Sequence, residues 1–189
     1  MKILSQLVKI SFLITLQTNL TWGQNIKIVE PEFSGVIVYA NDTIGEGIRL
    51  EDQAATTRTK SNAAAYLPYA NLVAGKTKVK NIVNGCCSNV IIKKHTDIQF
   101  IVKVKDNSID PTTLINIFKL TPEEDKRTCE LSSATIIGGT KTGEINYIKF
   151  KAVKYGTSSY LLTIKELEPG EYTMTLPERR EFFHLFAIK

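Results

Sequence analysis

Histidine and tryptophan are scarce in this sequence of 189 residues. The histidines are His95 and His184, and the one tryptophan is Trp22. A serine or cysteine hydrolase needs a base beside its nucleophile, most often histidine, and the chain has no G-x-S-x-G motif. We interpret His95, which follows two lysines, as a surface residue, and His184 as part of a sheet. The sequence therefore predicts no catalytic residues and no enzymatic activity.

Clustered metal ligands and phosphate-binding loops are also missing. Cys86 and Cys87 are adjacent instead of forming a C-x-x-C pair, and no histidine lies near them. The segment VKDNSIDP, residues 104–111, offers oxygen ligands but lacks the glycine and glutamate of an EF-hand loop. The segment GGTKTGE lacks the order of a P-loop. We therefore predict neither a metal nor a cofactor.

No apolar run reaches the roughly 18 residues that a transmembrane helix needs. The run ISFLITL, residues 10–16, follows two lysines and precedes QTNLTWG, which ends in small residues typical of a cleavage site. We predict a signal peptide over residues 1–23 and a single domain over residues 24–189. The mature protein is then secreted or periplasmic, with no membrane insertion after processing. The alternative is that residues 10–16 belong to a buried first helix.

The excess of positive charge is small. The formal net charge of +5 falls to +3 without residues 1–23, which hold two lysines and no acids. This bias is too mild for a nucleic-acid-binding protein. In KTKVK and KFKAVK the lysines alternate with other residues, as on the solvated face of a strand. The alternative for these lysines is docking of an acidic polymer or a membrane.

The predicted mature chain has an odd number of cysteines, Cys86, Cys87 and Cys129. Secretion permits a disulfide, and adjacent strand residues point to opposite faces, so at most one neighbour can meet Cys129. We predict a disulfide from Cys86 or Cys87 to Cys129, which would close a loop of about 43 residues and contribute about 4 kcal/mol. Plain buried thiols are the alternative.

Alternation of apolar and polar residues with a period of two dominates the rest of the chain. It is clearest in residues 98–104, 148–152, 160–165 and 172–176. Seven further runs bring the total to about eleven short strands, many separated by turn segments such as NDTIGEG and VNGCCSN. This pattern predicts an all-β protein, an antiparallel sandwich of about 7–11 strands with at most one short helix.

Residues 50–75 lack a clear periodicity. We interpret them as a long excursion between strands, with a short helix near residues 62–66. Tyr66 and Tyr69 lie in this segment and outside the strand pattern, and we predict that they form a contact surface, because loops carry binding residues more often than strands do. The alternative is that both rings anchor the excursion to the sandwich.

The segment LEPGEYTMTL, residues 167–176, predicts a tyrosine corner. Pro169 and Gly170 suit a tight turn, and Tyr172 begins the following strand, from which its hydroxyl can bond back to the corner. The fold that has this feature is an immunoglobulin-like or transthyretin-like sandwich. The antibody pattern is absent, because Met174 stands where antibody domains have a cysteine.

Three segments resemble secreted β-rich proteins of unknown function from Bacteroidetes-type bacteria: FIVKVKDNSIDP, IFKL and KYGTSSYLLTIKELEPGEY. The resemblance implies an exported β-rich protein of the cell envelope and no particular activity. We therefore predict a secreted, non-enzymatic binding or interaction module of the bacterial cell envelope, whose partner is an envelope protein or a glycan and not nucleic acid. A carbohydrate-binding domain and a small hydrolase of unknown type are the alternatives.

Overall fold

The computed structural model describes residues 28–40, 47–61, 76–135, 139–142 and 145–189. The predicted signal peptide, the helix expected near residues 62–66, and Tyr66 and Tyr69 lie outside these ranges. No helix of the described ranges is both long enough and apolar enough to cross a membrane.

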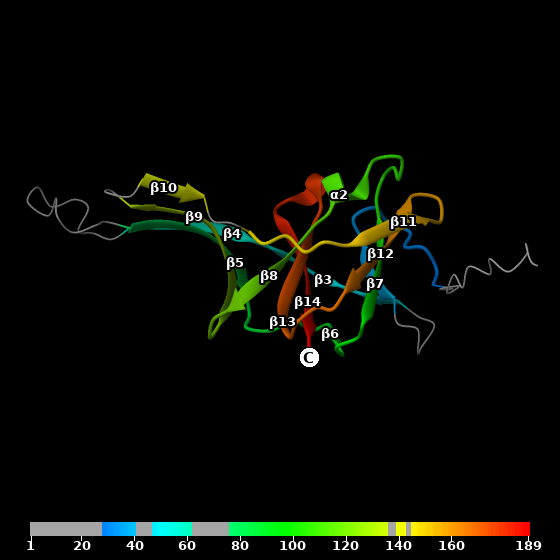
Figure 1. The fold of residues 1–189 in the computed structure, drawn as a ribbon, viewed down its shortest axis with the longest axis horizontal. Helices are drawn as coiled ribbons and strands as arrows, with labels where there is room; N and C mark the ends of the chain where they lie inside the picture. The colour runs from blue at the N-terminus through cyan, green and yellow to red at the C-terminus, as the bar shows by residue number, and fades with distance from the viewer. Residues whose placement is uncertain (1–27, 41–46, 62–75, 136–138, 143–144) are drawn as a thin grey trace, which may run out of the picture.

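Two β-sheets form the described structure (Figure 1). The first sheet has the strand order β11 (Lys151–Tyr155), β12 (Ser159–Lys165), β7 (Asp97–Lys103), β1 (Ile37–Ala40) and β2 (Gly47–Arg49). The second has the order β3 (Glu51–Ala54), β14 (Phe182–Ile188), β13 (Gly170–Thr175), β8 (Asn116–Pro122), β9 (Lys126–Thr135), β5 (Lys76–Asn84) and β4 (Thr56–Ser61). In addition, β10 (Gly139–Thr142) pairs with β9, and β6 (Ile91–Ile92) pairs in parallel with β14.

The prediction of an all-β, antiparallel sandwich is confirmed, and the described residues form fourteen strands instead of about eleven. The described helical segments are the four-residue helix α2 (Pro111–Leu114) and the 3-10 turn η2 (Pro177–Arg179). Asp110 caps α2 by accepting a hydrogen bond from the backbone N–H of Thr112 at 2.9 Å. A carboxylate at this position satisfies an N–H that the helix itself leaves unpaired.

The excursion predicted over residues 50–75 is wrong in its first part, where β3 and β4 form. Leu50 is buried, and its N–H donates to the Ile37 carbonyl at 2.9 Å, so the chain passes from the first sheet to the second at this residue. The strand β4 has the sequence TTRTKS and, among the described strands, pairs with β5 alone. An edge strand of this kind needs no apolar stripe, and threonine suits a strand.

Periodicity in the sequence does not predict the strand β9. Its sequence KRTCELSSAT mixes polar and apolar residues without alternation. A register shift between Val79 and Lys80 of β5 interrupts the β5–β9 ladder, and such an irregularity breaks the two-residue period. The strand nevertheless lies between β8 and β5 and joins the two halves of the second sheet.

Apolar side chains cover both faces of β14 and its neighbours. One face meets the first sheet in the main core, where Phe186 packs with Phe100 at a centroid distance of 5.0 Å. The other face forms a second cluster, in which Phe183 and Leu185 pack with Val83 of β5 and Cys129 of β9. The second sheet therefore curls so that β5 and β9 cover its own outer face. This explains why FFHLFAI is a nearly continuous apolar run, and why the polar residue Thr173 is fully buried.

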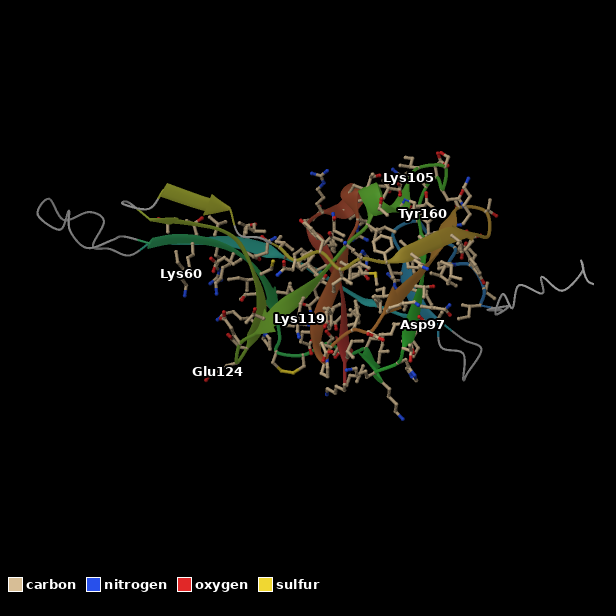
Figure 2. All side chains as sticks on the ribbon, in the orientation of Figure 1. Lys60, Asp97, Lys105, Lys119, Glu124 and Tyr160 are labelled. Atoms are coloured by element: carbon tan, nitrogen blue, oxygen red, sulfur yellow. A yellow bond between two sulfur atoms is a disulfide. The ribbon has the colours of Figure 1, made fainter. Side chains whose placement is uncertain are left out.

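The strands β4, β5, β9 and β10 extend from the sandwich along the long axis of the molecule (Figure 1). We call these four strands the arm. Its end near the sandwich belongs to the second apolar cluster, whereas Figure 2 shows the side chain of Lys60 pointing away from β4 into solvent. The arm is thus anchored at one end by apolar packing.

Tyr172 has the arrangement expected of a tyrosine corner. Its ring is buried and stacks on Phe186 at a centroid distance of 5.5 Å, and its hydroxyl donates to the Glu168 carbonyl at 2.6 Å. Gly170 has φ +153°, and a Cβ there would lie 2.4 Å from Cε of Lys119. The Lys119 ammonium in turn donates to the Pro169 carbonyl at 2.9 Å. Backbone shape and side-chain bonds therefore fix the entry of the chain into β13.

Candidate functional site

Tyr147 borders two surface hollows beside β8. Its side chain is 56% exposed, and its ring meets the edge of Phe118 at a centroid distance of 6.1 Å. The following residue is tied to β8, because the Ile148 N–H donates to the Ile117 carbonyl at 2.8 Å. Tyr147 therefore presents an aromatic surface to solvent from a backbone that is held in place.

The first hollow has a volume of about 360 Å³ and lies between the sandwich and the base of the arm. Apolar side chains, among them Phe118, Leu131 and Phe183, form part of its lining. The polar side chains in its lining are Asn81, Thr113, Asn116, Thr175 and Arg180. Amide, hydroxyl and guanidinium groups thus surround an aromatic and aliphatic floor.

The second hollow, of about 480 Å³, lies on the other side of Tyr147 and shares Asn116 with the first. Thr112 and Lys149 are its other polar side chains. We call the two hollows together the Tyr147 groove. A third hollow, lined by Val104, Ile109 and Leu176 among others, has about 120 Å³, which is small for an organic ligand.

The helix α2 positions the polar edge of the Tyr147 groove. Asp110 holds the helix start through Thr112, whose N–H and hydroxyl both donate to the Asp110 carboxylate. These hydrogen bonds lower the pKa of Asp110, and the one from the Thr112 N–H has the largest effect. Thr112 and Thr113 then lie in α2, and Asn116 begins β8 two residues after the helix ends. The capped helix therefore sets the position of one wall of the groove.

His184 has an acidic neighbour but no access to solvent. Its side chain is fully buried in β14, and Nδ1 lies 3.2 Å from Oδ1 of Asp52, which also pairs with Arg49 at 3.1 Å. Burial lowers the pKa of His184, although the Asp52 carboxylate opposes that shift. Nε2 has no hydrogen-bond partner among the described residues. A base that no substrate can reach performs no catalysis, so this pair is structural.

His95 is exposed in the segment between β6 and β7, as interpreted from the sequence. His184, by contrast, is fully buried. Within the described ranges, no group of three or more histidine, cysteine or carboxylate side chains is arranged to hold a metal ion.

The predicted disulfide from Cys86 or Cys87 to Cys129 is wrong, because Cys86 and Cys87 bond to each other. In the β5–β9 ladder Cys129 pairs with Asn81, whereas Cys86 follows the end of β5. The last residue of β5, Asn84, pairs with Lys126, so Cys86 lies beyond the part of the ladder that faces Cys129. Cys129 is instead a free thiol in the second apolar cluster, and burial raises its pKa.

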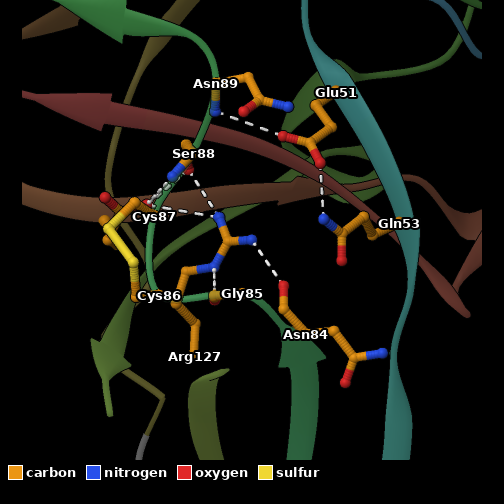
Figure 3. Close-up of polar contacts among 10 residues, drawn as sticks. Glu51, Gln53, Asn84, Gly85, Cys86, Cys87, Ser88, Asn89 and Arg127 are labelled. Carbon is orange, nitrogen blue, oxygen red and sulfur yellow. Dashed lines mark hydrogen bonds and ion pairs between the residues drawn. A yellow bond between two sulfur atoms is a disulfide. The ribbon is translucent and has the colours of Figure 1, made fainter. Parts of the chain in front are cut away.

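A buried ion pair lies beside the Cys86–Cys87 bond (Figure 3). Arg127 of β9 is fully buried, and its Nη1 donates to the Ser88 hydroxyl at 2.8 Å and to the Glu171 carboxylate at 3.4 Å. The other guanidinium nitrogens donate to the backbone carbonyls of Gly85 and Asn84. This cluster joins the arm, the loop after β5 and the strand β13. The sequence offers no signal for it, because its members are 39 or more residues from Arg127 along the chain.

The lysines of the segments KTKVK and KFKAVK lie as on the solvated face of a strand, where the structure describes their side chains. Lys78 of the arm pairs with Glu130 at 2.9 Å, and Lys80 pairs with Glu123 at 3.2 Å. The lysines of β11, Lys151 and Lys154, are exposed. The acids that face Lys78 and Lys80 reduce the positive field of the arm.

No known protein-family model matches this chain, and no curated protein matches its sequence significantly. The fold and the surface together define an all-β protein of sandwich architecture with a curled second sheet, an arm and an exposed aromatic groove.

Proposed function

We propose that this chain is a secreted, non-enzymatic binding module of the bacterial cell envelope and that the Tyr147 groove is its contact surface. The observation that carries the proposal is an exposed, anchored aromatic side chain between two hollows lined by polar groups. Aromatic residues contribute most of the binding energy in many interfaces. The contact surface predicted at Tyr66 and Tyr69 lies outside the described residues and stays a separate prediction.

Four further features support secretion and a module of the immunoglobulin-like or transthyretin-like class. The N-terminal pattern is that of a signal peptide. The Cys86–Cys87 disulfide suits an oxidising compartment. The tyrosine corner at Tyr172 is a feature of the sandwich class, and three segments resemble exported proteins of Bacteroidetes-type bacteria.

An affinity capture tests the module. Immobilised protein is exposed to an envelope extract of the source cell at low and at physiological salt, and captured protein and glycan are both analysed. We expect a partner that is retained at physiological salt and lost with Tyr147→Ala. Phe33→Ala is the matched control, because Phe33 is a 65% exposed aromatic outside the groove. Retention only at low salt, or equal retention by both variants, would contradict the proposal.

A glycan ligand is favoured by the composition of the groove. The C–H face of a sugar ring stacks on an aromatic ring, and its hydroxyls bond to amide, hydroxyl and guanidinium groups such as those of Asn116, Thr113 and Arg180. Calorimetry with the oligosaccharides released from the envelope tests this candidate directly. We expect binding that Asn116→Ala weakens at least about tenfold. A partner that survives deglycosylation would exclude it and leave a protein ligand.

A further inference from the structure

The Cys86–Cys87 disulfide contributes little as a structural cross-link. A disulfide stabilises a fold chiefly by restricting the unfolded chain, and that effect grows with the length of the loop it closes. The two cysteines are neighbours in sequence, so their bond encloses no further residue. The stability of the fold therefore depends on other interactions around this loop.

The chain on both sides of the disulfide is held by bonds that do not involve sulfur. Before it, the carbonyls of Asn84 and Gly85 accept hydrogen bonds from Arg127 at 3.0 and 2.9 Å, and the Gly85 N–H donates to the Asp125 carbonyl at 2.8 Å. After it, the Ser88 N–H donates to the Glu171 carboxylate at 3.0 Å. These bonds keep the loop in place whether the sulfur atoms are joined or separate.

Both cysteines of the pair are exposed, whereas the third is enclosed. An attacking thiolate needs access to a disulfide sulfur, and exposed disulfides are the labile ones. Cys129 is buried in the second apolar cluster and pairs with Asn81 in the ladder, so it is separated from the loop. Exchange at the loop is therefore confined to two sulfur atoms.

We propose that the Cys86–Cys87 disulfide is a thiol–disulfide exchange site whose reactant is an external thiolate. The thiolate attacks one sulfur of the pair, a mixed disulfide forms, and the other cysteine leaves as a thiolate. A second external thiolate then attacks the mixed disulfide. The products are the oxidised reactant disulfide and two cysteines that take up protons, so that the protein gains two electrons and the reactant loses two.

The reverse reaction is favoured by the position of the two thiols. Arg127 and Glu171 fix the backbone at both ends of the dipeptide, so the sulfur atoms of Cys86 and Cys87 stay close after the bond opens. Closure of the ring from a mixed disulfide is then an intramolecular step, with a high effective concentration. The site therefore exchanges reversibly while the protein remains folded.

The test measures the redox state of the folded protein. The full chain is equilibrated in buffers with increasing ratios of reduced to oxidised glutathione, quenched with an alkylating reagent under native conditions and analysed by mass spectrometry. We expect a change from no label to two labels, on Cys86 and Cys87, with an unchanged circular dichroism spectrum. Cys129 is an internal control, because a third label reports unfolding.

Two variants and a second reactant complete the test. Cys87→Ser cannot close the ring and should accumulate a stable mixed disulfide with glutathione at Cys86, whereas Cys129→Ser should behave as the natural protein. A dithiol oxidoreductase whose resolving cysteine is replaced by serine tests whether the reactant is a protein thiol. If it is, this oxidoreductase should form a trapped mixed disulfide with the chain faster than glutathione opens the Cys86–Cys87 bond. The proposal is overturned if neither reactant opens the disulfide, or if opening always exposes Cys129 to label.

Discussion

Glu30 shows how one carboxylate fixes a hairpin. It accepts hydrogen bonds from the N–H groups of Thr157 and Ser158, both at 2.9 Å, and from the Ser159 hydroxyl at 2.7 Å, and it pairs with Lys103 at 3.0 Å. Partial burial of the carboxylate raises its pKa, but these donors outweigh that effect and lower the pKa of Glu30 to about 2. The turn between β11 and β12 is thus held by a residue more than a hundred positions earlier.

We expect Glu30→Gln to lower the free energy of unfolding at pH 7 by about 2 kcal/mol, since hydrogen bonds to a charged group contribute roughly 1.5–3 kcal/mol. The folded pKa lies below the ordinary value of 4.5, so the contribution is complete above pH 4.5 and is lost as the pH falls towards 2. Urea titrations at pH 7 and pH 3 measure both effects. Glu32→Gln, at an exposed neighbour, is the control, and an equal loss in both variants would contradict the assignment.

His184 also makes stability fall with decreasing pH, but in a range closer to neutral. Its pKa is lowered below the ordinary 6.5 by burial, so the unfolded chain binds a proton more readily than the native protein. We therefore expect the melting temperature to fall as the pH decreases below 6.5, and His184→Asn to remove this slope, because asparagine offers a donor near the Nδ1 position but does not titrate. Calorimetry between pH 7 and pH 5 measures it. His95→Gln should keep the slope, and its loss there would contradict the prediction.

Single hydrogen bonds from tyrosine hydroxyls hold two of the connections that lead into or out of the strands. The tyrosine corner is the clearest case, because the Tyr172 hydroxyl reaches back four residues to the Glu168 carbonyl and ties the loop before β13 to the core. Tyr160 of β12 does the same over a longer range, with a hydrogen bond to the Ile109 carbonyl. In both elements the ring belongs to the core and the hydroxyl fixes a connection.

Removal of the corner hydroxyl should cost about 1 kcal/mol, the usual net value of one neutral hydrogen bond. Tyr172→Phe leaves the ring stacked on Phe186 and changes only this bond. Chemical denaturation measures the difference from the natural protein. Tyr147→Phe is the control, because that side chain is exposed, and we expect a change within about 0.5 kcal/mol. A Tyr172→Phe variant as stable as the natural protein would show that the hydroxyl bonds water equally well.

At the scale of the whole molecule, the arm and the sandwich are joined by the second apolar cluster and by one buried ion pair. Arg127 donates hydrogen bonds to the carbonyl of Asn84 at the end of β5, to the loop that follows β5 and to Glu171 of β13. Because Arg127 is fully buried and the Glu171 side chain is only 11% exposed, water compensates poorly for the loss of either partner. The junction therefore contributes to the stability of both parts.

We expect Arg127→Met to lower the free energy of unfolding by about 3–5 kcal/mol, because it leaves the Glu171 carboxylate buried without its cation. Hydrogen exchange should show faster exchange in β5 and β9 than in β12. The double variant Arg127→Met with Glu171→Gln should recover part of the loss, since no charge remains unpaired. Additive losses in the double variant, or unchanged exchange in the arm, would contradict this account of the junction.

Local patterns in the sequence determined the class of fold, the alternation of β7 and β12, and the corner at Tyr172, because each depends on residues a few positions apart. Tertiary structure decided the rest. The curl of the second sheet buries both faces of β13 and β14, places the polar strand β4 at an edge, and brings Arg127 to Glu171. It also separates Cys129 from Cys86 and brings Tyr147 beside β8. These contacts join residues distant in sequence, and neither periodicity nor spacing encodes which strands become neighbours.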